Sequence, residues 1–253
     1  MNPLRDQLNA IGLRATAENL DDLVAHATKK RLGPTEFLEH ISQIEQKSRA
    51  QKSLDRRLAR SRLGRFKPMA DYEWDWPTKI KRDAIETVLR LEFLADARNI
   101  VLIANQGLGK TMTAKNIAHQ AILGGHSVLF TTASQMLLDL AGQDSARGLD
   151  RRLRYYANVG LLVVDELGYL SYDARNADLL FQVVSRRYER KSLILTTNLA
   201  FSDWPGIFPN AACATALIDR VVHHAEIIKI EGQSYRLRAA SDEKKAKPAK
   251  KAA

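Results

Sequence analysis

The stretch IVLIANQGLGKTMTAKNIAH, residues 100–119, joins an apolar run, a glycine-containing turn and a helical repeat. Residues 100–103 are all apolar, as expected for a strand that is buried on both faces. The turn ANQGLGKT, residues 104–111, has the spacing of a phosphate-binding loop, whose glycines let backbone N–H groups face phosphate oxygens. The helix that follows adds partial positive charge at its N-terminus. This order of elements predicts a site for ATP.

Residues of the turn have individual expected roles. We expect Lys110 to reach the β- and γ-phosphates and the Thr111 hydroxyl to bind Mg²⁺. Ala104 stands where the first glycine of the pattern is usual, and its methyl group is tolerable if its backbone stays in an ordinary region. The alternative is a chance glycine turn beside a lysine. The residues expected to contact ATP are Asn105, Gln106, Gly107, Leu108, Gly109, Lys110, Thr111 and Met112.

A second apolar run, LLVV at residues 161–164, ends in the carboxylates of Asp165 and Glu166. Ligands of α/β proteins bind at the C-terminal ends of parallel strands. We expect Asp165 to hold Mg²⁺ through water and Glu166 to orient and polarise the water that attacks ATP. The alternative is a solvated acidic turn after a core strand.

Two polar residues further along the chain are candidates for the same chemistry. Asn198 follows the strand-like run LILTT, residues 193–197, and is expected to reach the γ-phosphate or the attacking water, unless it is only a turn residue. Arg220 lies off the apolar stripe that Leu217 and Val221 form, so it is free to reach a neighbouring subunit's ATP as an arginine finger. The alternative for Arg220 is a cation that the dipole favours near a helix C-terminus.

His223 and His224 are adjacent in the sequence. Successive residues of a helix project about 100° apart, so two neighbouring histidines are poorly placed to share one metal ion. We therefore expect a helix-end role for this pair rather than metal binding.

Apolar periodicity divides the chain. Residues up to about 67 have helical patterns only, and Pro34, after Gly33, suits a helix start. Beyond a junction that contains prolines and tryptophans, residues 68–77, strand-like runs alternate with helical repeats. This alternation predicts an α/β fold with a parallel sheet covered by helices on both faces. The lysine-rich residues 241–253 predict a basic, disordered tail.

The composition narrows the class of protein. The chain has 39 Lys and Arg against 29 Asp and Glu, a formal net charge of +10, which favours a polyanionic partner such as nucleic acid over a merely basic soluble protein. One cysteine, Cys213, allows no internal disulfide, as in a reducing compartment. No apolar run approaches the roughly 18 residues of a membrane span. We expect a cytoplasmic protein without a membrane partner.

Longer strings resemble a known family. They are RYERKS at residues 187–192, TNLAFSDW at 197–204, LIDRVVHH at 217–224 and IEGQSYR at 230–236. Together they are similar to the IstB-like helper proteins of transposition, and the resemblance covers nearly the whole chain up to residue 236.

The resemblance implies an AAA+ ATPase of the initiator and helicase-loader clade, related to DnaC. The implied fold is a P-loop three-layer parallel sheet sandwich with a small all-helical N-terminal domain and no C-terminal lid. The implied domains are a helical DNA- or partner-binding domain at residues 1–67, an AAA+ ATPase domain at 68–240 and a basic tail at 241–253. Glu166 departs from the Asp-Asp pair common in this family, and the longer acid is expected to alter the hydrolysis rate. The resemblance makes Lys110 and Thr111 the Walker A pair, Asp165 and Glu166 the Walker B pair, Asn198 sensor 1, and Arg220 the finger that acts in trans.

Proteins of this family assemble on duplex DNA with ATP, remodel target DNA, and recruit and activate the IstA transposase. The resemblance therefore implies an ATP-dependent oligomer that binds double-stranded DNA largely without sequence preference. Two other functions stay open: a replicative helicase loader of the DnaC type, and a DNA-binding adaptor that binds ATP and hydrolyses it weakly. We expect hydrolysis of ATP to ADP and phosphate, stimulated by DNA.

Two arginine-rich segments are candidates for contact with DNA phosphates. Such contacts position a protein without reading sequence and are sensitive to salt. In both segments the alternative is a solvated helix face. The first segment provides Arg56, Arg57, Arg60, Arg62 and Arg65, and the second provides Arg151 and Arg152, with Arg154, Tyr155 and Tyr156 beside them.

Overall fold

The computed structural model describes residues 3–169, 171–235 and 237–238, and contacts divide the chain into two compact units between Arg57 and Leu58. The expected tail at residues 241–253 lies outside the described residues. The boundary predicted at residue 67 separates a DNA- or partner-binding domain from an ATPase domain. That assignment of functions stays a prediction.

The first unit is helical, as predicted. Gly12, with φ of +83°, follows the first helix, and the fourth helix begins at Pro34 as the sequence indicates. The helices are α1 (Pro3–Ala10), α2 (Arg14–Glu18), α3 (Leu20–Lys30) and α4 (Pro34–Ser61), the last of which continues past the division between the units.

One buried carboxylate fixes α2 against α4. Glu45 is only 6% exposed, and its Oε1 accepts the Thr16 backbone N–H at 2.9 Å and the Thr16 hydroxyl at 3.0 Å. Buried charges in proteins are paired or hydrogen-bonded, and here Arg49 also lies 3.8 Å from Glu45 Oε2. These contacts join α2 to α4 through one buried side chain.

The helical prediction is wrong for residues 62–67. Helix α4 ends at Ser61, whose hydroxyl donates to the Leu58 carbonyl at 2.7 Å and accepts the Leu63 N–H at 3.3 Å. Arg62 then adopts a left-handed backbone with φ of +57°. The buried Leu63 side chain fixes this turn, and no periodic pattern in the sequence signals it.

The second unit contains a six-stranded sheet in the order β1-β6-β2-β5-β4-β3. Strands β2 to β6 pair parallel with one another, which confirms the predicted strands and the mainly parallel sheet. The strands are β1 (Lys79–Ile80), β2 (Asn99–Ala104), β3 (Val128–Thr132), β4 (Leu161–Leu167), β5 (Ser192–Thr197) and β6 (Ala225–Glu231).

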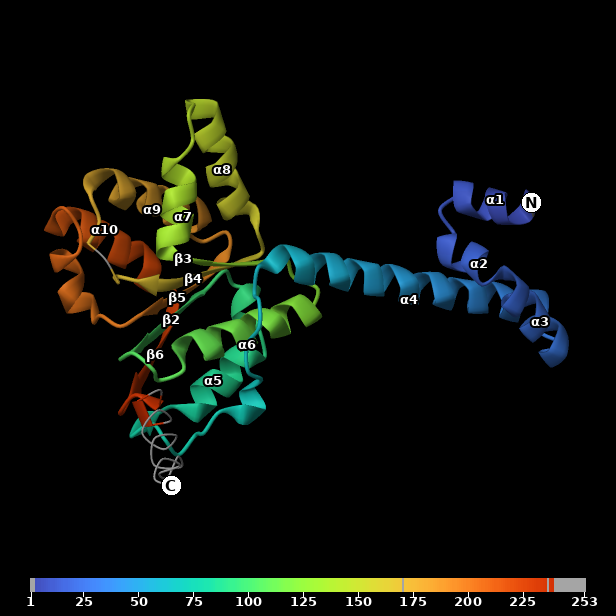
Figure 1. The fold of residues 1–253 in the computed structure, drawn as a ribbon, viewed down its shortest axis with the longest axis horizontal. Coiled ribbons are helices and arrows are strands. Elements are labelled where there is room, and N and C mark those ends of the chain that lie inside the picture. The colour runs from blue at the N-terminus through green and yellow to red at the C-terminus, as the bar shows by residue number, and fades with distance from the viewer. Residues whose placement is uncertain (1–2, 170, 236, 239–253) are drawn as a thin grey trace, which may run out of the picture. The chain divides into compact units, whose positions relative to one another are not determined.

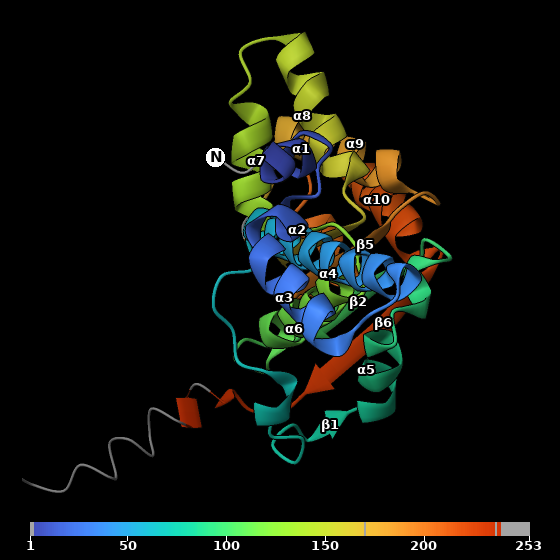
Figure 2. The same cartoon turned by 90° about the vertical axis from the view of Figure 1, so that its right-hand side faces the viewer.

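Strand β1 was not predicted. It lies beside the C-terminal end of β6 (Figure 2) and pairs with it antiparallel, with Lys79 opposite Glu231. A strand of two residues carries no periodic signal, so the sequence pattern could not indicate it.

Helices cover both faces of this sheet, as predicted (Figure 1). Helices α5 and α6 pack on one face, while α7, α9 and α10 form the other layer and α8 packs against α9. This is the expected three-layer α/β sandwich. The helices are α5 (Arg82–Leu89), α6 (Lys110–Leu123), α7 (Ala133–Ala141), α8 (Ala146–Asn158), α9 (Ala174–Arg187) and α10 (Ala211–Val222), with short 3-10 turns at Met69–Asp71, Glu92–Leu94 and Phe201–Gly206.

Arg187, at the end of α9, is 1% exposed. Burial lowers the pKa of its guanidinium to about 9, so the group still carries its charge at neutral pH. Backbone carbonyl dipoles, rather than a carboxylate, surround this charge, and the contacts connect the end of α8 to the start of β5. The carbonyls belong to Tyr156, Ala157, Val159, Gly160 and Ser192.

Candidate functional site

A pocket of about 590 Å³ opens over the C-terminal ends of strands β2, β4 and β5. The residues of the glycine-containing turn from Gln106 to Met112 line one side of it, and Glu166 and Asn198 line another. Residues that lie far apart in the sequence therefore meet at the edge of the sheet where α/β proteins bind ligands.

The turn between β2 and α6 has the backbone that its glycines permit. Gly107 has φ of +80° and Gly109 has φ of +87°, values that side chains disfavour. A Cβ atom at Gly109 would lie 2.6 Å from the Tyr72 ring, so glycine is also required for space. Ala104 is the last residue of β2 and does not have a positive φ, so a methyl group is accommodated there.

Lys110 is the first residue of α6 and points back over the turn. Its Nζ donates to the Ala104 carbonyl at 2.6 Å and to the Asn105 carbonyl at 2.9 Å. The ammonium group is thus held inside the loop, where an anion bound by the loop would compete with these carbonyls for it. The position fits a lysine that contacts phosphate.

Thr111 and Asp165 form the polar centre of the site. The Thr111 hydroxyl donates to the Asp165 carboxylate at 2.9 Å, and the Thr196 hydroxyl contacts the same carboxylate. Asp165 is 4% exposed. A hydroxyl and a buried carboxylate side by side are oxygen ligands of the kind that Mg²⁺ takes in proteins, so this pair fits the predicted metal role.

Glu166 has an unusual backbone. It lies at an irregularity in the pairing of β4 with β5, has φ of +60°, and donates its N–H to Thr196 Oγ1 at 3.0 Å. The side chain is exposed and lines the pocket. A left-handed conformation costs a non-glycine residue roughly 1–2 kcal/mol, and such conformations cluster at functional sites. Here it turns the acid out of the sheet at the pocket.

The structure brings Asn198 to this pocket but not Arg220. Asn198 directly follows β5 and is among the lining residues. Arg220 lies in the last turn of α10, where its guanidinium carbon stacks 4.3 Å from the centre of the Phe181 ring. Among the described residues, those that line the pocket do not include Arg220. A role for Arg220 at a triphosphate would therefore require the site of another subunit.

Aromatic residues form another wall of the pocket. Tyr72, Trp76 and Tyr235 all line it. The Tyr72 hydroxyl donates to the Leu108 carbonyl at 3.2 Å, and burial raises the pKa of Tyr72 to about 12. Only the concentration of aromatic residues at 72–76 hinted at this wall.

The residues after β6 contact the glycine-containing turn directly. The Tyr235 N–H donates to the Gly107 carbonyl at 3.1 Å, and Trp76 Nε1 donates to the Gln233 carbonyl at 2.9 Å. The Tyr235 hydroxyl also donates to Glu73 at 2.8 Å. These bonds connect the segment before β1, the turn after β2 and the segment after β6.

The two arginine-rich segments differ in how their side chains are held. Arg151 on α8 is exposed, whereas Arg152 pairs with Asp139 and lies 4.3 Å from the centre of the Tyr155 ring. Arg154 pairs with Asp150 at 2.6 Å. In the first segment Arg57 is half-buried and donates to Ser53, and the remaining four, Arg56, Arg60, Arg62 and Arg65, are exposed.

The helices give one further result. Across the part of the chain that the structure describes, none combines the length and the apolar character that a membrane crossing requires.

The chain is similar to known proteins in both sequence and fold. The family model described as IstB-like ATP binding protein matches residues 6–243. A Pseudomonas aeruginosa protein of insertion sequence IS21, named as a candidate ATP-binding protein, is 32% identical over 94% of this chain and 90% of its own length. Among solved structures, DnaI is similar with a TM-score of 0.53 at 19% identity, covering 64% of this chain and 90% of that one. The DnaC helicase loader has a TM-score of 0.50 at 17% identity, covering 70% of this chain and 99% of that one, and these two likenesses show the fold.

Proposed function

The chain belongs to the family of IstB-like ATP binding proteins, and from that premise we propose that it is an ATPase that works on DNA in transposition. In this proposal it binds ATP with Mg²⁺, assembles on double-stranded DNA without reading its sequence, and recruits and activates a partner transposase. The family membership agrees with the resemblance found in the sequence strings.

The observation that carries the proposal is the meeting of four kinds of group at one pocket. These are the glycine turn with Lys110, the Thr111–Asp165 pair, the exposed Glu166 and the amide of Asn198. Phosphoryl transfer is catalysed mainly by positioning and by electrostatic stabilisation, and these groups supply both. The presence of Glu166 beside the glycine turn favours hydrolysis, because a protein that only bound the nucleotide would not need an acid at this position.

Each residue has a role in the proposed reaction. Backbone N–H groups of the turn and Lys110 hold the β- and γ-phosphates, for which Lys110 exchanges its contacts with the loop carbonyls. Thr111 and Asp165 would hold Mg²⁺, which neutralises charge that develops on the phosphates. Glu166 accepts a proton from the attacking water, and Asn198 orients that water or the γ-phosphate.

Duplex DNA is the proposed partner because the net charge is +10 and arginines with exposed side chains lie on α4 and α8. On α8 we assign phosphate contact chiefly to Arg151, since Arg152 and Arg154 already pair with carboxylates. Arg56, Arg57, Arg60, Arg62 and Arg65 stay the proposed contacts of the first segment.

Stimulation of hydrolysis by DNA tests the function. We expect duplexes of unrelated sequence to raise the rate of phosphate release, and added salt to remove the stimulation because phosphate contacts release counterions. The measurement is steady-state phosphate release with Mg²⁺ and ATP, with and without duplex. ATP-dependent assembly on DNA with no turnover would instead identify an adaptor that uses ATP as a structural ligand.

Replacing Arg220 with alanine tests whether two subunits share one site. We expect unchanged ATP binding and loss of hydrolysis, with turnover lower by about 1,000-fold or more, because a finger stabilises charge that develops only during the reaction. Arg175→Ala is the matched control, since Arg175 lies on the neighbouring helix α9 and bonds the Ala141 carbonyl at 2.8 Å.

Mixing experiments then decide between a shared and a local role. An equal mixture of Arg220→Ala and Glu166→Gln chains contains about a quarter of interfaces with both groups intact, if the finger acts in trans. Turnover of the mixture should therefore exceed that of either variant alone. A mixture as inactive as its components would show that Arg220 is a structural residue.

A further inference from the structure

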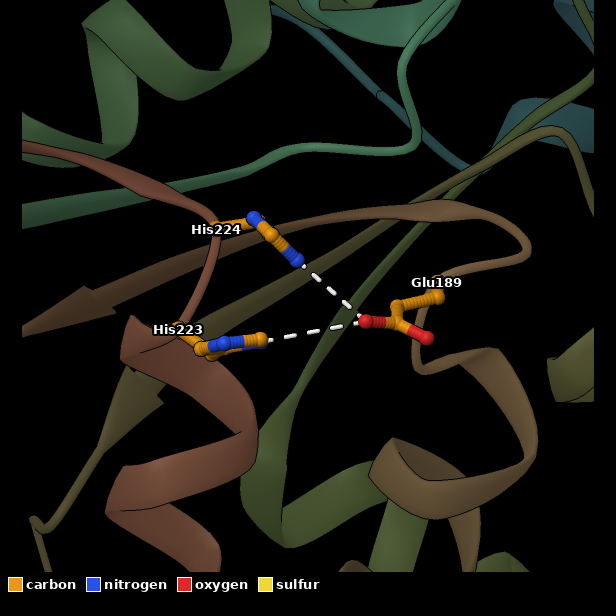
Figure 3. A group of neighbouring side chains, drawn as sticks. All are labelled: Glu189, His223 and His224. Atoms are coloured by element: carbon orange, nitrogen blue, oxygen red, sulfur yellow. Dashed lines mark hydrogen bonds and ion pairs between the residues drawn. The ribbon is translucent and has the colours of Figure 1, made fainter.

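Three metal-ligating side chains meet at the surface of the second unit, away from the nucleotide pocket (Figure 3). Glu189 lies in the turn between α9 and β5, His223 caps the C-terminus of α10, and His224 lies between α10 and β6. We propose that these three residues bind one Zn²⁺ ion.

The structure removes the objection that adjacent histidines diverge. Helix α10 ends at Val222, and His223 is its C-cap residue, with backbone angles of φ −49° and ψ −41°. The centres of their rings lie 4.0 Å apart, and both side chains point to the Glu189 carboxylate (Figure 3). The predicted helix-end role agrees with the position of His223 as the C-cap of α10, and the approach of both rings to Glu189 adds a geometry that the sequence did not indicate.

The ligand atoms have separations close to those of a metal site. Glu189 Oε1 lies 3.2 Å from His224 Nε2 and 3.8 Å from His223 Nδ1, and the three ligand atoms all lie within 4.8 Å of one another. Tetrahedral Zn²⁺ with bonds of about 2.0–2.1 Å separates its ligands by roughly 3.4 Å. Small side-chain rotations therefore bring all three atoms to bonding distance.

The chemistry of the ligands selects the class of metal. Two imidazoles and one carboxylate suit Zn²⁺ and its late first-row neighbours, whereas Mg²⁺ prefers oxygen ligands only. Three protein ligands leave a fourth tetrahedral position for water or for a partner molecule. The proposed ion is thus different in kind from the one expected beside Thr111 and Asp165.

Hydrogen bonds of one buried residue, Asn99, hold the backbone under the cluster. Asn99, at the start of β2, donates its backbone N–H to the His224 carbonyl at 2.7 Å and its side-chain N–H to the Val221 carbonyl at 3.0 Å. Its Oδ1 accepts the Leu193 N–H at 3.0 Å, and Asn99 is only 8% exposed. One buried side chain thus connects the turn before β6 to the start of β5. Such a preformed framework lowers the cost of ordering the ligands.

One existing contact competes with the ion. The Tyr188 hydroxyl lies 2.7 Å from His223 Nδ1, the same nitrogen that faces Glu189. Coordination through Nδ1 would displace this bond to an exposed tyrosine hydroxyl, which water can then satisfy.

Metal binding would fasten the end of α10 to the turn after α9. Arg220 lies in the last turn of α10, so the ion would restrain the helix that carries it. This consequence rests on the proposed function, but the metal site does not, because its test needs neither ATP nor DNA.

The test is titration of the untagged, metal-free chain with Zn²⁺, followed by calorimetry, without nucleotide. We expect one Zn²⁺ per chain, and at least about tenfold weaker binding for His224→Ala and for Glu189→Gln, since even groups that only support a ligand contribute that much. Co²⁺ in place of Zn²⁺ should give the intense visible absorption of a tetrahedral site.

Controls keep the result interpretable. His126→Ala removes another exposed histidine outside the cluster and should bind Zn²⁺ like the unchanged chain. Zn²⁺ should raise the thermal midpoint of the unchanged chain but not of Glu189→Gln, whose midpoint in chelator shows whether it folds normally. Equal Zn²⁺ affinity for the unchanged chain and both cluster variants would overturn the proposal.

Discussion

Replacing Glu166 with glutamine is expected to lower the rate of ATP hydrolysis about 1,000-fold and to leave ATP binding unchanged. Glutamine has the same length and the same backbone cost at φ of +60°, and the bond from the residue-166 N–H to Thr196 is kept. The substitution therefore removes only the ability to take a proton from water. Phosphate release and titration with a fluorescent ATP analogue measure the two quantities separately.

Two further variants make that result specific. Glu226→Gln makes the same chemical change at an exposed residue of β6 outside the pocket and should hydrolyse ATP normally. Lys110→Ala should differ from Glu166→Gln in that ATP binding itself is lost, and hydrolysis with it. Turnover of Glu166→Gln above about a tenth of the normal rate would exclude a proton-accepting role for Glu166.

The second large effect concerns stability rather than chemistry. Arg187→Met is expected to lower the free energy of unfolding of the second unit by about 3–5 kcal/mol, because buried carbonyls that the guanidinium satisfies lose their donor. For a unit of this size the thermal midpoint should fall by roughly 6–20 °C. Thermal unfolding followed by circular dichroism measures the change.

The neighbouring arginine is the natural control. Arg186 makes a partly exposed ion pair with Asp150 at 2.9 Å, so Arg186→Met should cost at most about 1 kcal/mol. Arg187→Lys should fall between the two, because one ammonium cannot reach carbonyls on both sides of the guanidinium. Equal stability of Arg186→Met and Arg187→Met would show that the buried charge contributes no net stability.

The sequence predicted the features that leave a local pattern of residue types, namely the buried strands and the glycine-containing turn. Continuous apolar runs identified β2, β4 and β5 because strands buried on both faces need them, and parallel pairing then brought Asp165 and Asn198 to one edge. The glycines at 107 and 109 were informative because no other residue fits that backbone and space. These features follow from local chemistry, so one chain was enough to predict them.

What the sequence did not predict depends on contacts between distant residues. The left-handed backbone of Glu166 is stabilised from a different strand, by Thr196. The burial of Arg187 depends on carbonyls about 30 positions earlier in the chain as well as on Ser192. The convergence of His223 and His224 on Glu189 depends on how the end of α10 lies against the turn after α9. No periodicity records such contacts, because each is set by tertiary packing.

The bond between the Tyr235 N–H and the Gly107 carbonyl has a mechanical consequence. A shift of the Gly107 carbonyl would strain or break this bond, so the position of the glycine-containing turn is coupled to the chain just beyond the last strand. Occupancy by a triphosphate would thus be transmitted to the polypeptide that leaves the sheet on that side, and a reporter dye placed there would sense events at the γ-phosphate.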